Sequence, residues 1–158
     1  MSDNLLPDIT VRVVDPEEDV IAELLQENID EMRGLGVVVP ELSDLLLRSF
    51  RQEGKFLGAW SDSPLPVGMV GVRLLEPSLA ELKRLYVRPS HRRMGVGAHL
   101  MRAAIRSAAL LGANRLRLDT AASLTAAVAL YRSMGFQEIQ RYNNNPEAEL
   151  WFELSLAS

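Results

Sequence analysis

Glu81-Leu-Lys-Arg-Leu-Tyr-Val-Arg-Pro-Ser-His-Arg-Arg-Met-Gly-Val-Gly-Ala-His-Leu-Met101 is the stretch that decides the fold, because it has the pattern of a strand, a glycine-bearing loop and a helix in succession. Gly95 and Gly97 leave the backbone N–H groups at the start of the helix open, since no side chain stands in front of them. The positive end of the helix dipole adds to the attraction for an anion. The stretch therefore predicts a phosphate-binding loop at a strand-to-helix junction.

The loop itself, Arg92–Gly97, is an R-x-x-G-x-G pattern. Other phosphate motifs match less well: G-x-x-x-x-G-K-[ST] is absent, and the third glycine and early strand of a dinucleotide-binding fold are missing. The loop resembles the acetyl-CoA pyrophosphate loop of the GNAT-type N-acetyltransferase superfamily. Ala129-Leu-Tyr-Arg-Ser-Met-Gly-Phe136 resembles the second signature of that superfamily, and Ala80-Glu-Leu-Lys-Arg-Leu-Tyr-Val87 its fourth strand. The three matches stand in the right order, and the resemblance extends from about Thr10 to Leu156.

Composition limits the classes of protein that remain. A chain of 158 residues that is 47% hydrophobic fits one globular domain, expected over residues 1–158. A net charge of -4 argues against nucleic acid and anionic membranes as partners. Cysteine is absent, which excludes disulfides, thiolate metal ligands and a cysteine nucleophile. The first residues resemble no secretion signal, so a cytoplasmic protein is expected.

Hydrophobic periodicity and turn residues predict the order β-α-α-β-β-β-α-β-α-β-β, which is also the order of the superfamily. The fold class expected is α/β (α+β), with a GNAT-like mixed, mostly antiparallel twisted sheet and helices on both faces. The strands are expected at Thr10–Val14, Phe56–Trp60, Val67–Leu75, Leu79–Val87, Arg115–Thr120, Phe136–Arg141 and Glu149–Leu156, and the helices at Ile21–Met32, Leu42–Phe50, Gly97–Leu111 and Leu124–Met134.

Local signals refine three of these elements. Asp15 and Pro16 have the pattern of an N-cap and a first helical residue, and Ser123 is expected to cap the helix that carries Tyr131. Gly135 should end that helix, with Phe136 packing back on its last turn. In the strand Leu79–Val87 the apolar Leu82 and Leu85 are an odd number of residues apart, which predicts a β-bulge.

Acetyl transfer to an amine needs the amine to lose a proton, and the resemblance to the histone-acetyltransferase branch suggests Glu81 as the general base. An ordered water could take the proton instead, and Glu81 could be a strand glutamate on a solvated face, paired with Lys83 or Arg115. Tyr131 is the candidate general acid, since a phenol can protonate the departing thiolate. The alternative for Tyr131 is a ring in the core with its hydroxyl at the surface.

The resemblance also implies how acetyl-CoA, the expected cosubstrate, would be held. A bulge in the segment Leu85, Tyr86, Val87 would polarise the thioester carbonyl through a backbone amide. The pyrophosphate would lie on Arg92, Arg93, Met94, Gly95, Val96, Gly97 and Ala98, with a phosphate contact from at least one of the two arginines. Leu124 replaces an asparagine common in the superfamily, so Ser123 is a candidate for that contact. The basic residues of this region are clustered, as a polyanionic cosubstrate requires. No metal is expected.

The sequence thus predicts an acetyl-CoA-dependent N-acetyltransferase working by direct transfer in a ternary complex. The acceptor is left open between a small-molecule amine and a protein amine, and a homodimer is also left open. One alternative is a non-catalytic CoA-binding regulatory domain of the same fold. Another, a nucleic-acid module built on the arginine cluster, lacks aromatic or helix-borne contacts and is disfavoured by the acidic net charge.

Overall fold

The computed structural model describes residues 8–39 and 44–156. Its strands are β1 (Thr10–Val14), β2 (Gly54–Trp60), β3 (Gly68–Glu76), β4 (Leu79–Val87), β5 (Arg115–Thr120), β6 (Gln137–Ile139) and β7 (Leu150–Ser155). Its helices are α1 (Asp19–Gly34), α2 (Asp44–Gln52), α3 (Val96–Leu110) and α4 (Thr125–Ser133), with a short 3₁₀ turn, η1, at Pro89–His91. The predicted order of strands and α-helices is confirmed. None of the helices in the described parts of the chain combines the length and apolarity needed to cross a bilayer.

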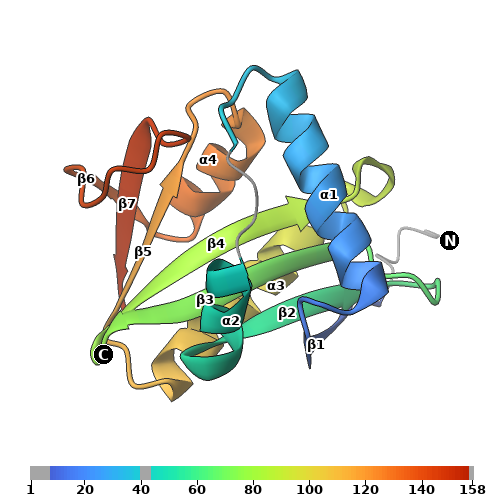
Figure 1. Ribbon diagram of the computed structural model, residues 1–158, viewed down its shortest axis with the longest axis horizontal. Helices are drawn as coiled ribbons and strands as arrows, with labels where there is room; N and C mark the ends of the chain where they lie inside the picture. The colour runs from blue at the N-terminus through green and yellow to red at the C-terminus, as the bar shows by residue number, and fades with distance from the viewer. Residues whose placement is uncertain (1–7, 40–43, 157–158) are drawn as a thin grey trace, which may run out of the picture.

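All seven strands form one sheet in the order β1-β2-β3-β4-β5-β7-β6. Every pairing is antiparallel except that of β4 with β5, which is parallel. The chain leaves the sheet after β4, forms α3 and returns as β5, so the parallel pair lies in the middle of the sheet (Figure 1). The predicted mixed, mostly antiparallel sheet is therefore confirmed.

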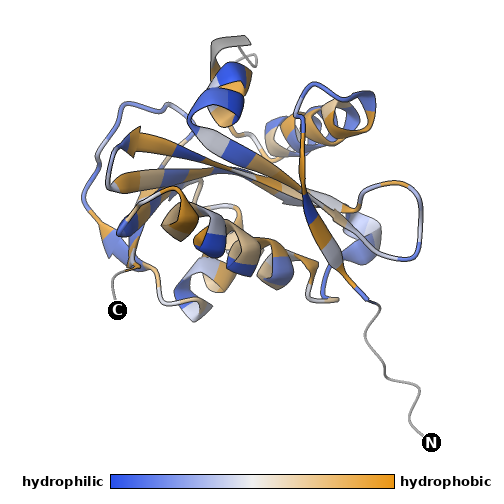
Figure 2. Cartoon of the chain, turned by 90° about the horizontal axis from the view of Figure 1, so that it is seen from below, coloured by the Kyte–Doolittle hydropathy of each residue, from blue (hydrophilic) through white to orange (hydrophobic). Residues whose placement is uncertain are grey.

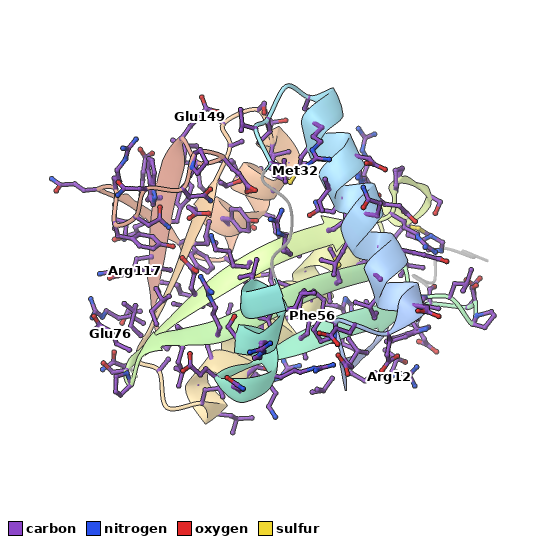
Figure 3. All side chains as sticks on the ribbon, in the orientation of Figure 1. Arg12, Met32, Phe56, Glu76, Arg117 and Glu149 are labelled. Atoms are coloured by element: carbon purple, nitrogen blue, oxygen red, sulfur yellow. The ribbon has the colours of Figure 1, made fainter. Side chains whose placement is uncertain are left out.

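Helices cover both faces of the sheet (Figure 2). On one face α3 and α4 pack over a core that includes Leu100, Leu116, Leu118 and Phe152, all fully buried. On the other face α1 and α2 enclose a smaller cluster that includes Phe56 (Figure 3). The ring of Phe56 meets that of Phe50 edge to face, with centroids 5.1 Å apart. The two helix layers bury both faces of the sheet and so hold its strands in place.

The predicted bulge lies in the second half of β4. Lys83 pairs with Gly71 of β3 and Tyr86 pairs with Met69, so two residues of β4, Arg84 and Leu85, oppose a single residue of β3. Arg84 adopts a positive φ of 60°, which only a minority of non-glycine residues do. Beyond the bulge, β4 and β5 diverge (Figure 1).

Two capping predictions are wrong. Helix α1 begins at Asp19 with Glu18 as its N-cap, because Asp15 is held by Arg51 and by the backbone N–H of Glu17 in a preceding turn. The N-cap of α4 is Leu124, without a side-chain hydrogen bond, so Ser123 does not cap that helix. Strand β6 is shorter than the predicted Phe136–Arg141. The predicted second helix included Leu42, which lies outside the described residues.

Candidate functional site

Two adjoining cavities occupy the region where β4 and β5 separate. The pairing of β4 with β5 stops at Leu82 and Leu118, and beyond this point each strand continues alone. The larger cavity, of about 630 Å³, lies over the loop before α3 and the first turns of α3 and α4. The smaller, of about 220 Å³, lies over the middle of β4 and the end of β5. Four residues line both cavities: Asn28, Met32, Leu85 and Leu124. The cavities therefore meet at the β4 bulge, under α1.

The larger cavity collects the residues that the sequence predicted for the cofactor. All of them except Met94 line it: Leu85, Tyr86, Val87, Arg92, Arg93, Gly95, Val96, Gly97, Ala98 and Ser123. They come from the end of β4, the loop, the first turn of α3 and the segment before α4. Their roles toward a cofactor stay predictions, but the fold brings them to one concave surface.

Glycine is needed at positions 95 and 97 of the loop for different structural reasons. Gly95 is the N-cap of α3 with φ 85°, a left-handed conformation that glycine adopts without strain. A Cβ at Gly97 would lie 3.1 Å from Leu130 of α4, so Gly97 allows the two helices to approach closely. The first helical bond of α3 runs from the N–H of His99 to the carbonyl of Gly95. The N–H groups of the preceding residues have no partner inside the helix and lie at the cavity.

The two arginines of the motif are not equivalent. Arg92 donates to the carboxylate of Glu31 on α1 and to the carbonyl of Val87, the latter at 2.9 Å. Arg93 is exposed, has a φ of 62°, and forms no hydrogen bond or ion pair with any described residue. An incoming phosphate would find the donors of Arg93 free, whereas Arg92 is already bound.

The other cations of the predicted basic cluster are also neutralised within the protein. Their ion pairs join Lys83 to Asp119 at 3.0 Å, Arg84 to Glu147 at 3.3 Å and Arg88 to Glu27 at 2.9 Å. Each of these three side chains faces a carboxylate from a distant part of the chain, and a role for them toward a polyanion stays a prediction.

Tyr131 lines the smaller cavity, and the residue before it, Leu130, lines the larger one. Its ring is buried against Phe136 and Phe152, with centroids 6.0 and 6.2 Å away. As predicted, Gly135 follows the helix with a positive φ of 97°, and the N–H of Phe136 bonds the carbonyl of Tyr131. The hydroxyl has no hydrogen-bond partner among the described residues. Burial, and secondarily the charge of Asp119, raise the pKa of this phenol, so Tyr131 is protonated at neutral pH.

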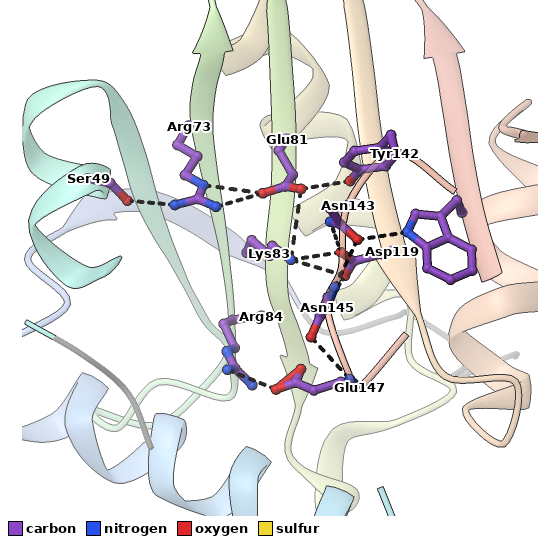
Figure 4. Close-up of polar contacts among 11 residues, drawn as sticks. Ser49, Arg73, Glu81, Lys83, Arg84, Asp119, Tyr142, Asn143, Asn145 and Glu147 are labelled. Atoms are coloured by element: carbon purple, nitrogen blue, oxygen red, sulfur yellow. Dashed lines mark hydrogen bonds and ion pairs between the residues drawn. The ribbon is translucent and has the colours of Figure 1, made fainter. Parts of the chain in front are cut away.

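Glu81 lies at the centre of a polar network on the α2 side of the sheet (Figure 4). It is 1% exposed. One carboxylate oxygen accepts from Arg73 Nη2 at 2.9 Å and the other from the Tyr142 hydroxyl at 2.7 Å. Lys83 Nζ lies 3.8 Å away. Glu81 lines neither cavity. A solvated strand position is thus wrong for Glu81, and its predicted role as base stays a prediction.

The network contains residues that the sequence argument did not select. Asp119 of β5 accepts from Lys83 and from the side-chain amide of Asn145, the latter at 3.1 Å, and Asn143 accepts from the indole N–H of Trp151 at 2.9 Å. These bonds attach the segment between β6 and β7 to the middle of the sheet. The sequence did contain an indication for Asp119, because strand alternation places its side chain on the face of β5 opposite to that of the buried Leu116 and Leu118.

Comparisons with known proteins agree with this geometry. Residues 21–136 match the model of the acetyltransferase (GNAT) family. The chain is 34% identical over 128 residues to an uncharacterized N-acetyltransferase of Schizosaccharomyces pombe, covering 78% of each chain. It is 32% identical over 103 residues to human N-acetyltransferase 8, covering 62% of this chain but only 45% of that protein.

A solved structure shows the same fold. The Salmonella typhimurium protein yncA, solved with its cofactor acetyl-CoA, superposes with a TM-score of 0.71 at 17% identity, covering 94% of each chain. The match to the family model extends from α1 through the phosphate-loop motif to the end of α4, and so includes the whole lining of the larger cavity and that of the smaller one except Asn145 and Glu147. The chain belongs to the GNAT family of acetyltransferases.

Proposed function

We propose that the protein transfers an acetyl group from acetyl-CoA to a primary amine, directly and within a ternary complex. The observation that carries the proposal is the meeting of two cavities beside Tyr131, one with the features of a phosphate-binding groove and one small and polar. The acetyl-CoA complex of the similarly folded yncA supports acetyl-CoA as the cosubstrate. A thioester lying along the larger cavity would present its acetyl group at the β4 bulge.

The cofactor would be bound mainly by backbone groups. The N–H groups of the first turn of α3 would receive the pyrophosphate, because they have no partner within the helix and their residues line the larger cavity. Arg93 would add a charge-assisted contact. The backbone at Leu85, where β4 leaves its regular pairing, would polarise the thioester carbonyl.

In the transfer step, the nitrogen of a neutral amine in the smaller cavity attacks the thioester carbonyl carbon. The C–N bond forms and the C–S bond breaks, and the electron pair of the C–S bond leaves with sulfur. The phenolic proton of Tyr131 goes to this thiolate, which departs as the thiol. Because its pKa is raised, Tyr131 holds its proton at neutral pH and is available as the donor.

The amine's own proton needs a different acceptor. Glu81 is less suited to accept this proton than the sequence predicted, because both of its carboxylate oxygens already accept hydrogen bonds and the residue lines neither cavity. We therefore assign the proton to water in the smaller cavity and give Glu81 the task of holding Arg73 and Tyr142 in place. Asp119, which does line the cavity, already accepts bonds from Lys83 and Asn145.

Calorimetry with acetyl-CoA, followed by a thiol-release assay against a panel of amines, tests the proposal. We expect micromolar binding and release of CoA thiol with at least one primary amine. Binding with no release on small amines, lysine peptides or peptide N-termini would favour the regulatory CoA-binding domain instead. Absence of acetyl-CoA binding by folded protein would remove both functions.

A further inference from the structure

The cations that line the smaller cavity are not all firmly held. Lys83 Nζ lies 3.0 Å from each oxygen of Asp119. Arg73 donates through Nε and Nη2 to one oxygen of Glu81, at 3.2 and 2.9 Å. Both carboxylates are almost fully buried, at 4% and 2% side-chain exposure, so these pairs are shielded from solvent. Lys83 and Arg73 are therefore committed to the protein's own network (Figure 4).

Arg84 is held more loosely. Its one ion pair runs from Nη2 to Glu147 at 3.3 Å, which is longer than the roughly 2.7–2.9 Å of a strong charge-assisted bond. Nη1 makes only a weak contact to the sulfur of Met32, at 4.0 Å. A guanidinium has five N–H donors, and the Nε–H of Arg84 has no partner among the described residues. The side chain is 9% exposed and lines the cavity, so donors remain for oxygen atoms that enter it.

The backbone explains why this side chain faces the cavity. Regular strand alternation would send neighbouring side chains to opposite faces of the sheet. The bulge interrupts the alternation after Lys83, and β4 lines the smaller cavity through the consecutive residues Leu82, Lys83, Arg84 and Leu85. The left-handed φ of Arg84 is strained for a residue other than glycine, so the surrounding structure has to hold it. Strained positions of this kind cluster at functional sites.

A second polar group in the same place lacks a partner. Asn28 of α1 is 6% exposed, lines both cavities, and its Oδ1 makes no hydrogen bond. An unpaired buried amide oxygen costs free energy that a ligand's N–H group would recover. Asn28 precedes Met32 by one helical turn, and the sulfur of Met32 contacts Arg84. The amide of Asn28 and the guanidinium of Arg84 are therefore close to each other on the cavity wall.

We propose that the acceptor is a small molecule of the amino-acid type, with a carboxylate a few bonds from its primary amine. Arg84 binds the carboxylate, and Asn28 accepts an N–H bond from the amine where the two cavities meet. The proposal rests on the proposed acetyl transfer and names its substrate class. A monoanionic carboxylate suits the site better than a phosphate dianion, because Glu147 and Asp119 also line the cavity and would repel the larger charge more strongly.

Matched amines test the class. Alanine, methionine and phenylalanine are each offered as the free acid, the amide and the decarboxylated amine, and kcat/KM is compared per neutral amine. We expect the free acid to exceed the other two forms by about 10-fold or more in at least one series, the range for a charge-assisted bond. In parallel, calorimetry with CoA-saturated protein measures binding of the same compounds without needing turnover.

Variants assign the preference to residues. Arg84→Asn removes the charge with a residue that tolerates the left-handed φ, and should bring the acid-to-amide ratio close to one while acetyl-CoA affinity is retained. Glu147→Gln removes the competing carboxylate and should raise affinity for the acid alone. Asn28→Ala should weaken all three forms alike. Arg106→Gln, an exposed arginine of α3 that lines neither cavity, controls for net charge.

The outcomes separate this proposal from the proposed function. An amide or plain amine preferred over the acid in every series, or an acid preference unchanged in Arg84→Asn, overturns it. Absence of both turnover and binding for all these compounds, in protein that binds acetyl-CoA, overturns the amino-acid class while leaving the acetyltransferase intact. Loss of acetyl-CoA binding itself would instead count against the proposed function.

Discussion

Arg92 and Glu31 form an ion pair that joins the phosphate-loop motif to helix α1. Arg92 also donates to the carbonyl of Val87 at 2.9 Å, and its guanidinium lies 5.7 Å from the centre of the Tyr86 ring. Arg92, the first arginine of the R-x-x-G-x-G motif, thus links the loop to α1 and to the end of β4. Arg93 is left as the motif's free cation among the described residues.

The two arginines should therefore respond differently to replacement. We expect Arg93→Ala to raise the Kd for acetyl-CoA by about 5- to 10-fold, the lower end for a charge-assisted contact at an exposed site, with no change in Tm. Arg92→Ala should lower the stability by about 0.5–1 kcal/mol, since its ion pair is partly solvated, and should change Kd less. Calorimetry and thermal unfolding measure both, with Arg106→Ala as the control. A larger loss of affinity in Arg92→Ala would mean that CoA displaces Glu31.

Gly97→Val should abolish acetyl-CoA binding. A Cβ at this position already lies 3.1 Å from Leu130, and the branched side chain would extend into the larger cavity over the first turn of α3. We expect at least a 100-fold rise in Kd by calorimetry. Gly34→Val is the matched control, because a Cβ there meets no atom within 4 Å and Gly34 lines neither cavity. Unchanged affinity in folded Gly97→Val protein would remove the phosphate-loop assignment.

Tyr131→Phe should keep acetyl-CoA affinity and lower kcat by roughly 100-fold or more, the range for loss of a general acid. Since the pKa of Tyr131 is raised, the wild type should show no alkaline loss of kcat from this group up to pH 10. The control is Tyr142→Phe, whose hydroxyl donates to Glu81 and which lines neither cavity. Single-turnover measurement confirms that chemistry limits the rate, and a wild-type kcat in Tyr131→Phe would make Tyr131 a packing residue.

The parts of the site that are local in sequence were predictable from the sequence. The glycine loop, the bulge and the turn after Tyr131 each depend on a few consecutive residues. The loop and the turn lie where they were predicted, and the bulge lies at Arg84 and Leu85, one residue earlier than the predicted segment Leu85–Val87. The partners of charged residues were not predictable in this way. Arg92 and Glu31 are 61 positions apart, as are Glu81 and Tyr142, so only the packed fold decides these pairs.

The wrong cap of α1 has the same cause. Asp15 has the local features of an N-cap, but Arg51, 36 positions away, binds its carboxylate and the helix begins four residues later. Asp15 keeps a local bond to the backbone N–H of Glu17, but this bond closes a turn that precedes the helix, where Arg51 also holds the carboxylate. For Glu81, the sequence predicted a catalytic base, and only the packed fold shows that its carboxylate faces Arg73 and lines neither cavity.

Glu81→Gln tests whether that carboxylate is a base or a structural anchor. As an anchor, its loss weakens the bonds from Arg73 and Tyr142, and we expect a stability loss of about 1–3 kcal/mol, the range for hydrogen bonds to a buried charge. The pH profiles of kcat/KM for the two proteins should then be parallel, because water takes the proton in both. Glu76→Gln, which replaces an exposed glutamate on β3, is the control.

If Glu81 were the catalytic base, the result would differ: the loss of kcat/KM in Glu81→Gln would be largest at low pH and would shrink toward pH 10 as free neutral amine accumulates. That profile, in a variant of unchanged Tm, would restore Glu81 as the catalytic base.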